Sequence, residues 1–590
     1  MKVQYVLAME KPQTHFFNIT MNIEDFTEEN MLVTMPAWAP GSYEIYDFAR
    51  FVRNLKAVSG ENELEVIKKD KSTWKIVTRE NHSIRLTYEV YANDLSVHTS
   101  QIDFTHAYLN GTSVFLYVEG YKDQSVELMI KPYSGWKIST GLEKLGENRY
   151  RAINYDILAD CPIEIGLHRS LYFSVEGKEH EIVIYGHGNE NEEKLKDDLK
   201  KIVEAYNRMF GHLPYKRYVF IYHLVSGDDD VIGGLEHLNS TTIDVDRFIF
   251  SPFDKYKQFL SVTSHEFFHL WNVKRIRPQE LGPFNYKEEN YTTMLWMAEG
   301  ITNFYAYLIL LRAGLIDQKE YLKHLAENMR YHDFLPGSDK TSASESSFDT
   351  WIKLYKPTPN NVNSYISYYL KGEILGFMLN TRIIEVTRGS KTLDDLFRYL
   401  MEKFNRDGKG YSEKDVINSI REVTGHDFSD FFQTYVRKPG KIDFSQELKK
   451  LGLTIRKGYR KVDGTEPERK SYLGIIVKGN GGRYIVDSVL EGSPAFEAGL
   501  NPKDEIVAIN GFRFGDRFLK DLREDFKKLR LDNLADYEPD SKVRINFFRR
   551  GILMDVELTL SSAPYEYYEI LDDPQPNNGS ENLKSKFLVT

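Results

Sequence analysis

The segment Ser264–Trp271, "SHEFFHLW", stands near the middle of a 590-residue chain and is predicted to lie on a helix. A helix advances about 100° and about 1.5 Å per residue, so His265 and His269 are about 40° apart around the axis and about 6 Å apart along it. One cation near that face can contact both imidazoles. Glu266 can reach a water on the same cation without being a ligand, which is the division of roles at catalytic zinc sites. The alternative is a buried helix with two hydrogen-bonded histidines.

A third ligand is predicted in the next helix, "LWMAEGITNFYAYL", which carries Glu299. The connection between the two helices contains Pro and Gly residues, so a short helical hairpin can place Glu299 opposite the histidines. A glutamate among Leu, Trp, Met, Phe and Tyr is costly to bury without a partner, and metal ligation compensates that cost. The alternative is a glutamate on the helix surface. The predicted set is His265, His269 and Glu299 with a water in the open position, as at catalytic zinc.

Length and composition restrict the class of protein. A chain of 590 residues is too long for one core and suggests three or four domains. Its net charge of -10 and the absence of a basic block argue against a nucleic-acid partner. Cys161 is the single cysteine and cannot form an intramolecular disulfide. No secretory leader and no apolar stretch of about 18 residues is recognisable, so we expect a cytoplasmic protein without a membrane span.

The order of predicted elements indicates a multidomain α+β fold. Short β-rich runs fill residues 1–170 and predict an N-terminal β-sandwich-like domain. Residues 171–450 begin with strands and become mostly helical. Residues 455–562 are again β-rich, with a charged helix predicted over 516–530. Residues 563–590 are predicted to be a C-terminal tail.

Four segments carry a resemblance to a known family: "SHEFFHLWNVKRIRP", "TTMLWMAEGITNFYAY", "SYYLKGEILGFML" and "MPAWAPGSYEIYDFARFV". Together they resemble the glycyl aminopeptidase family of zinc metallopeptidases, in the gluzincin clan. The resemblance covers nearly the whole chain. It implies an N-terminal β-domain, a thermolysin-like catalytic domain and a C-terminal PDZ domain. It also implies removal of a small N-terminal residue, Gly or Ala, with one zinc ion per chain and Glu266 as the proton acceptor.

The segment Gly233-Gly234-Leu235-Glu236-His237 resembles the Gly-x-Met-Glu-Asn element of related aminopeptidases. There the backbone forms an edge for the substrate, and the glutamate pairs with the free α-amine. The resemblance therefore assigns amine recognition to Glu236, while Gly233 and Gly234 would allow the substrate backbone to approach closely. The alternative is a hairpin turn with a surface glutamate. His237 replaces the Asn of the relatives, and its role is open.

A tyrosine in a Tyr-x-Lys-Gly sequence stabilises the oxyanion in gluzincin aminopeptidases. Tyr369-Leu370-Lys371-Gly372 matches that spacing, and a phenol can donate a hydrogen bond to developing negative charge. Tyr368 points about 100° away on a helix, so only one of the two should face the metal. Tyr369 is the predicted donor, with Tyr368 as the alternative. Tyr365 is predicted to pack.

In the C-terminal module, Leu473, Gly474 and Ile475 resemble the carboxylate-binding loop of PDZ domains. Such a loop offers backbone N–H groups to a peptide C-terminus, and the peptide adds a strand to the sheet edge. The module would then dock a substrate or another peptide partner. The alternative is a packing domain without a ligand.

Three functions compete. The first is a zinc aminopeptidase acting on peptides with a free N-terminus. The second is an endopeptidase that uses the same metal site and is guided by the PDZ module. Glu236 favours the first, because an endopeptidase has no reason to hold a carboxylate where an α-amine would lie. The third is a peptide-binding scaffold with an inactive site, against which the intact metal motif argues. The sequence does not specify an oligomeric state.

Overall fold

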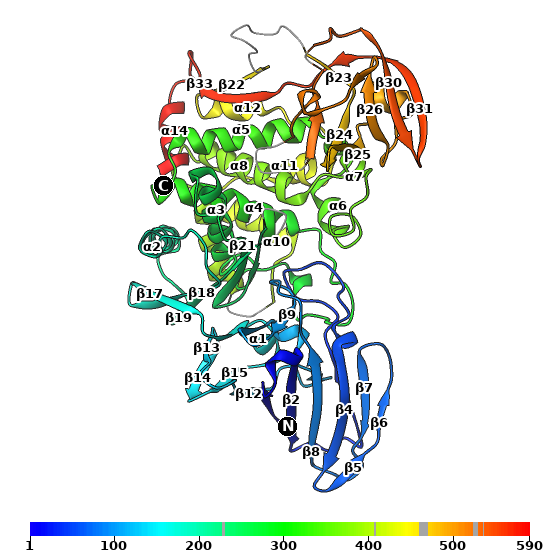
Figure 1. The fold of residues 1–590 in the computed structure, drawn as a ribbon. Coiled ribbons are helices and arrows are strands. Elements are labelled where there is room, and N and C mark those ends of the chain that lie inside the picture. The colour runs from blue at the N-terminus through cyan, green and yellow to red at the C-terminus, as the bar shows by residue number, and fades with distance from the viewer. Residues whose placement is uncertain (227–230, 406–408, 460–469, 523–528, 535, 590) are drawn as a thin grey trace. The chain divides into compact units, whose positions relative to one another are not determined.

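A computed structural model describes residues 1–226, 231–405, 409–459, 470–522, 529–534 and 536–589 of the chain (Figure 1). The chain divides into two compact units. The first unit comprises Met1–Thr292, Tyr305–Ile316 and Phe397–Val416, and the second comprises Thr293–Phe304, Asp317–Leu396 and Ile417–Thr590.

The first unit begins with a β-rich domain, as predicted. Its largest sheet contains, in order, β14 (Glu143–Gly146), β15 (Arg149–Ala152), β12 (Val126–Lys131), β1 (Lys2–Ala8), β2 (Phe16–Glu24), β8 (Ser83–Tyr91), β4 (Val52–Ser59) and β5 (Asn62–Leu64). Two four-stranded sheets accompany it: β13 (Lys137–Thr140), β16 (Ile163–Gly166), β10 (His106–Leu109), β9 (Ser100–Ile102); and β11 (Tyr117–Val118), β3 (Asn30–Thr34), β7 (Thr73–Val77), β6 (Val66–Lys68). Burial alternates along β2 and β8, so one face of each strand contributes to a shared hydrophobic core.

The first unit also contains a five-stranded sheet. Its order is β17 (Arg169–Val175), β18 (Lys178–Tyr185), β19 (Arg217–Val225), β21 (Ser240–Asp246) and β20 (Ile232–Glu236). β18, β19 and β21 run parallel, and β20 is an antiparallel strand at the edge. The helices α2 (Glu192–Phe210) and α3 (Phe253–Phe268) contact each other, and α3 contacts β20 and β21. The near-continuous burial of β19 is what a central parallel strand requires.

A buried chain of ionisable side chains links the β-rich domain to this sheet. His106 on β10 lies 2.9 Å from Glu164 on β16, measured from Nδ1 to Oε1. The other oxygen of Glu164 lies 3.2 Å from Nε2 of His223 on β19, whose Nδ1 is 2.7 Å from Oδ1 of Asp244 on β21. Burial would lower the pKa of His223, but Asp244 and Glu164 outweigh it and raise that pKa to about 9. His223 is therefore charged at neutral pH.

The second unit is mostly helical, as predicted for the middle of the chain. Helices in its segments include α5 (Gln318–Phe334), α6 (Ala343–Phe348), α7 (Asn361–Ser364), α8 (Tyr368–Val386), α11 (Ser429–Phe431) and α12 (Phe444–Lys450). Three further helices, α4 (Ile301–Arg312), α9 (Leu393–Phe404) and α10 (Glu413–Thr424), cross the limits between the units. α8 is buried over most of its length, which explains why its sequence is apolar on nearly all sides.

A second β-rich region follows the helices. Its sheet contains β28 (Leu519–Asp521), β29 (Leu529–Asp532), β24 (Ile475–Asn480), β25 (Arg483–Val489), β26 (Glu505–Ile509), β30 (Lys542–Arg549) and β31 (Ile552–Thr559), with β27 (Phe512–Arg513) paired to β26. Of the helix predicted over 516–530, Asp516–Phe518 form only a short 3-10 turn, and the prediction is wrong for the residues in β28 and β29, which are strands. Residues 523–528 lie outside the described residues. The multidomain α+β class is confirmed, while the predicted domain limits stay predictions.

The segment 563–590, predicted to be a tail, instead contains β33 (Tyr567–Asp572) and α14 (Ser580–Val589). β33 pairs antiparallel with β22 (Leu453–Gly458), and Gly458 faces Tyr567 in this register. Phe587 of α14 is buried against aromatic rings of the second unit: Phe304, Tyr321 and Phe377. The polar composition of residues 563–590 gave no indication that a few of its side chains are buried.

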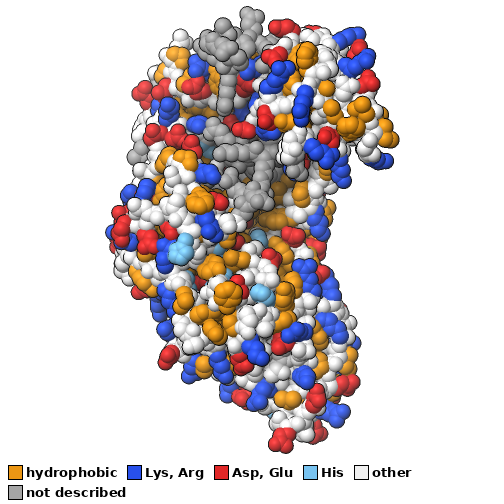
Figure 2. Space-filling view, in the orientation of Figure 1, with side chains coloured by type: hydrophobic (Ala, Val, Ile, Leu, Met, Phe, Trp, Pro, Cys, Tyr) orange, Lys and Arg blue, Asp and Glu red, His pale blue; other side chains and the backbone are white. Residues whose placement is uncertain are grey.

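Acidic and basic side chains are interspersed over the face in Figure 2. Among the described residues, none of the helices combines the length and apolar character needed to cross a membrane.

Candidate metal and peptide site

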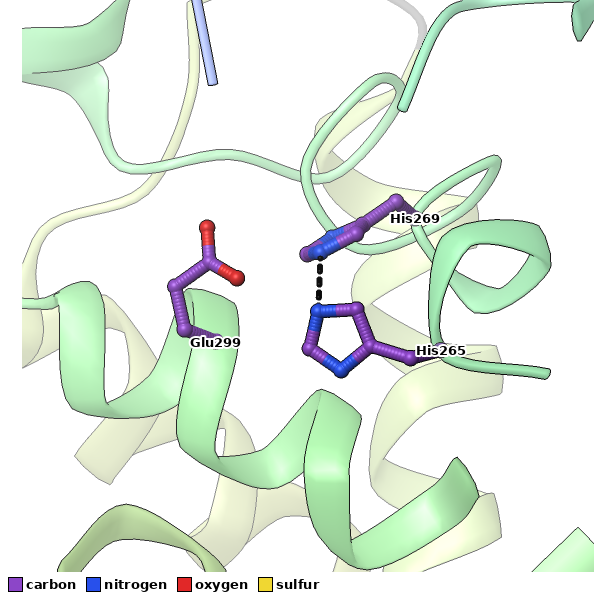
Figure 3. A group of neighbouring side chains, drawn as sticks. All are labelled: His265, His269 and Glu299. Atoms are coloured by element: carbon purple, nitrogen blue, oxygen red, sulfur yellow. Dashed lines mark hydrogen bonds between the residues drawn. The ribbon is translucent and has the colours of Figure 1, made fainter. Parts of the chain in front are cut away.

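α3 carries the two histidines as the sequence predicted. His265 lies in its last turn, and His269 follows as the C-cap with helical backbone angles. Their Nε2 atoms are 2.9 Å apart (Figure 3). Nδ1 of His269 is 2.6 Å from the backbone oxygen of Asn272, so this nitrogen must donate. The lone pair of neutral His269 is thereby left on Nε2, the tautomer that a metal ligand needs.

Glu299 lies on a π-helical turn, Trp296–Gly300, directly before α4. π-turns within helices occur often at functional sites. His265, His269 and Glu299 each offer one ligand atom, and these atoms all lie within 4.8 Å of one another (Figure 3). Glu299 is only 2% exposed. Two imidazoles and a buried carboxylate form a donor set that fits zinc.

Two glycines hold the Glu299 turn against α8. A β-carbon at Gly300 would come within 2.6 Å of the carbonyl carbon of Gly372, and one at Gly372 would come within 2.8 Å of Cα of Gly300. Side chains at either position would therefore separate the π-turn from α8. Gly372 belongs to the Tyr369–Gly372 motif, so this packing links the predicted oxyanion donor and Glu299 through one close backbone contact.

Among the three tyrosines, the structure distinguishes the surroundings of each ring. The hydroxyl of Tyr365 donates to the backbone oxygen of Ser346 at 3.2 Å, and that of Tyr368 accepts from Thr350 at 3.1 Å. Both rings are buried, whereas Tyr369 is half-buried and stacks on Tyr368. Half-exposure at the first turn of α8 is compatible with the predicted contact of Tyr369 with substrate.

Glu266 lies under the edge strand β20. It is 5% exposed, and a β-carbon at Gly234 would come within 2.6 Å of its Cγ. A β-carbon at Gly233 would have no neighbour within 4 Å. Gly234 is therefore required by its contact with Glu266, while Gly233 leaves space beside the exposed edge of the strand.

Glu236, the last residue of β20, is buried beside the motif. Ligand atoms of Glu236, Glu266 and His269 also lie within 4.8 Å of one another. Lys274 Nζ is 3.8 Å from Oε1 of Glu236 and 2.7 Å from Oδ1 of Asp160. The alternative of a surface glutamate at this position does not hold, because Glu236 is only 4% exposed.

Asp160 and Lys274 were not singled out in the sequence. Burial would raise the pKa of Asp160, but Lys274 and His237 outweigh it and lower that pKa to about 2. Burial would lower the pKa of Lys274, yet Asp160 and Glu236 raise it above its ordinary value. Nδ1 of His237 lies 3.4 Å from Oδ1 of Asp160, so His237 contacts the carboxylate that pairs with Lys274. Both members of the Asp160–Lys274 pair are therefore charged.

A cavity of about 110 Å³ adjoins Glu236, Asp160 and Lys274. The segment 35–52, "MPAWAPGSYEIYDFARFV", supplies part of its wall through Trp38, Pro40, Gly41 and Tyr43. Trp38 is fully buried and donates to the backbone oxygen of Asn285 at 2.9 Å. A β-carbon at Gly41, whose φ is +95°, would come within 2.8 Å of both carboxylate oxygens of Glu236. In the sequence, this segment was singled out only by its resemblance to the family.

In the C-terminal region, the predicted carboxylate-binding loop already contacts a carboxylate. The backbone N–H groups of Gly474 and Ile475 donate to Oδ1 of Asp532 at 2.9 and 2.7 Å, and that of Leu473 donates to Oδ2. Asp532 is fully buried on β29. No local pattern predicted this contact, since 57 to 59 residues separate the partners.

Comparisons with known proteins agree along the chain. Residues 4–167 match the model for the Peptidase M61 N-terminal domain, residues 258–375 that for M61 glycyl aminopeptidase, and residues 464–538 that for the PDZ domain. The crystal structure of an aminopeptidase N family protein from Idiomarina loihiensis aligns with a TM-score of 0.89 and 29% identity, covering 100% of both chains.

An aminopeptidase A of Legionella pneumophila in complex with aspartic acid aligns with a TM-score of 0.48 and 12% identity. That alignment covers 98% of this chain and 57% of the other. No curated protein sequence matches the chain.

Proposed function

Because the chain belongs to the M61 glycyl aminopeptidase family of metallopeptidases, we propose that it is a zinc-dependent aminopeptidase that removes one small N-terminal residue at a time. Membership implies the aminopeptidase activity and peptide substrates. The preference for Gly or Ala rests on the family alone. The assignment of individual residues rests on their chemistry and surroundings.

The observation that carries the proposal is the position of Glu236 beside Glu266. In an N-terminal residue, the α-nitrogen and the carbonyl carbon are two bonds apart, about 2.5 Å from bond lengths of 1.46 and 1.52 Å. A group that binds the α-amine must therefore lie within a few ångströms of the group that serves the carbonyl. Ligand atoms of Glu236, Glu266 and His269 within 4.8 Å of one another meet this requirement.

His265, His269 and Glu299 would hold one zinc ion. When bound there, zinc supplies Lewis-acid activation of the attacking water and of the peptide carbonyl. Glu266 accepts the proton of the water and later gives it to the leaving amine. The phenol of Tyr369 donates a hydrogen bond to the oxyanion. The edge strand β20, opened by Gly233, would align the substrate backbone.

The charges around Glu236 favour a cationic substrate group. Two carboxyl groups, those of Glu236 and Asp160, lie beside the single ammonium of Lys274, at 3.8 and 2.7 Å. A substrate ammonium, whose pKa is near 8, is mostly charged at neutral pH and would add a second cation beside these two carboxyl groups. Lys274 also restrains one oxygen of Glu236, which leaves the other available for the amine.

Hydrolysis of matched peptides with a free or an acetylated N-terminus tests the proposal. Loss of one partner of a buried charge pair costs about 2–5 kcal/mol, so we expect the free-amine peptide to have a kcat/KM larger by roughly 30-fold or more. Glu236→Gln should reduce that ratio by slowing the free-amine peptide. Equal kcat/KM for both peptides would instead support an endopeptidase. A panel of aminoacyl chromogenic substrates, with and without chelator, tests zinc dependence and the preference for Gly or Ala.

A further inference from the structure

Part of the chain occupies the place of a peptide ligand in the PDZ region. β24 pairs with β25 on one side and with β29 on the other, antiparallel, with Ile476 opposite Leu531 and Val477 opposite Arg530. A peptide that binds by β-augmentation pairs, as an extra strand, with the strand that follows the carboxylate-binding loop. In this chain that strand is β24. β29 is therefore the added strand, and it belongs to the same chain.

Asp532 ends this strand where a peptide C-terminus would end. Its carboxylate accepts hydrogen bonds from all three N–H groups of the loop, those of Leu473, Gly474 and Ile475. Bonds from backbone N–H groups to an ionised acceptor are shorter and stronger than neutral ones. The side chain thus satisfies the same donors that a terminal carboxylate would satisfy.

The backbone of the loop Leu473–Ile475 is held in place by contacts other than those with Asp532. Gly474 has a φ of +88°, and a β-carbon there would overlap the side chain of Ser493. The backbone oxygens of Leu473 and Gly474 accept from Ala495 and Leu490, each at 2.9 Å. The loop amides consequently keep their direction whichever carboxylate they bind.

The chain beyond Asp532 is also fixed. The N–H of Asn533 donates to the backbone oxygen of Phe518 at 2.7 Å, and that of Leu534 donates to Ser471 at 3.0 Å. Leu534 is fully buried in the hydrophobic core of the region. Asp532 is thus held from both directions, and an incoming peptide meets a closed groove.

We propose that β29 is an internal ligand of the PDZ region, with the Asp532 carboxylate in the place of a peptide C-terminus. A peptide with a free C-terminal carboxylate then binds the loop only when Asp532 leaves it. This inference is independent of the peptidase site, because it uses residues of the C-terminal region alone.

Fluorescence anisotropy with the full-length protein tests the inference. The probe is a short peptide that ends in valine and carries fluorescein on its α-amine, which leaves no free N-terminus for an aminopeptidase. It is used with a free and with an amidated C-terminus. We expect Asp532→Ala to bind the free-carboxylate probe at least about tenfold more tightly than wild type, and to discriminate against the amide.

Asp504→Ala is the matched control. Asp504 is a buried acid of the same region, but it accepts from Arg549 instead of the loop, so its loss should not create binding. Equal affinity of wild type and Asp532→Ala for the probe would overturn the inference. Failure of a folded Asp532→Ala protein to bind it would do the same, because Asp532 would then be only a structural link.

Hydrogen exchange keeps the inference testable if Asp532→Ala does not fold. In wild type, we expect the amides of residues 473–475 to be protected, and saturating free-carboxylate probe to leave that protection unchanged. In Asp532→Asn, which retains a side-chain oxygen but loses the charge, the same amides should exchange faster. Unprotected amides in wild type, or the same protection in Asp532→Asn, would contradict an internal ligand.

Discussion

A β-carbon at Gly234 would come within 2.6 Å of Cγ of Glu266, so strand β20 and the glutamate of the HExxH motif are in direct contact. Their positions are set together. The strand that would align the substrate backbone also limits where the predicted proton acceptor can lie. Any side chain at 234 must displace either the strand or Glu266.

Gly234→Ala should therefore reduce kcat strongly without removing the metal ligands. A displacement of about 1 Å in a reacting group can cost about 100-fold in rate. Gly146→Ala on β14 is the control, since a β-carbon there has no neighbour within 4 Å and Gly146 has no proposed role in the site. Steady-state kinetics and zinc content measure the two effects separately. Similar kcat values for the two variants would show that the contact does not position Glu266.

Glu266→Gln and Glu299→Ala should separate proton transfer from metal binding. Glutamine has nearly the shape of glutamate but cannot accept the proton, so Glu266→Gln should retain zinc and lose nearly all turnover. Glu299→Ala removes a proposed ligand and should lower zinc affinity. Zinc content by atomic emission, measured beside activity, distinguishes the two. Near-wild-type turnover by Glu266→Gln, or full zinc occupancy in Glu299→Ala, would contradict the assigned roles.

The sequence was informative where the chemistry depends on local spacing. His265, Glu266 and His269 lie within five residues, and a helix fixes their mutual geometry without knowledge of the rest of the chain. Glu299 could be found because a charged residue in an apolar helix needs a compensating partner. The fold class followed from the order of strand-like and helix-like segments, and the structure confirms it. The roles of the site residues stay predictions.

Contacts across long separations could not be read in this way. Lys274 lies 114 residues from Asp160, and neither residue belongs to a periodic pattern. The helix predicted over 516–530 failed for a related reason. Its charges have helical spacing, but Leu519 is buried in β28, which pairs with β29 in the C-terminal sheet, and tertiary pairing overrides local propensity.

His223 should make stability depend on pH in the alkaline range. Its pKa is raised to about 9, so the folded state binds a proton more tightly than the unfolded chain, whose histidine has a pKa near 6.5. The stabilisation is complete below pH 6.5 and is lost as the pH rises through 9, with a magnitude of about 3 kcal/mol. The midpoint temperature of thermal unfolding of the wild type should therefore fall steeply as the pH rises from 6.5 to 9.

His223→Gln should be less stable at neutral pH, because Glu164 and Asp244 lose a buried cationic partner. Its unfolding midpoint should also vary less between pH 6.5 and 9. His187 is exposed, so His187→Gln serves as the control and should behave like wild type. An unchanged alkaline slope in His223→Gln would assign the effect to other groups.

The pairing of β22 with β33 determines how the PDZ region can be removed. Gly458 and Tyr567 are opposite each other in this pair, and the PDZ region lies between them in the sequence. Both strands contact α5. Lys457 of β22 and Tyr568 of β33 each donate to the same oxygen of Asp333 on α5, at 3.1 and 2.7 Å. Truncation at residue 455 would remove β33 and α14 together with the PDZ region.

Excision of residues 459–566 should leave the peptidase folded, whereas truncation at 455 should not. Gly458 and Tyr567 can be joined by an Asn-Gly turn, which suits a two-residue hairpin between paired antiparallel strands. The truncated chain loses Phe587 from its contacts with Phe304, Tyr321 and Phe377, and loss of a buried Phe side chain alone costs about 3–5 kcal/mol.

We expect the excised protein to retain zinc and to hydrolyse dipeptide-sized substrates at a rate similar to wild type. The truncated protein should aggregate or lose zinc, as size-exclusion chromatography and metal analysis would show. If both proteins lose zinc, the PDZ region itself supports the peptidase fold; if both retain activity, β33 and α14 are dispensable.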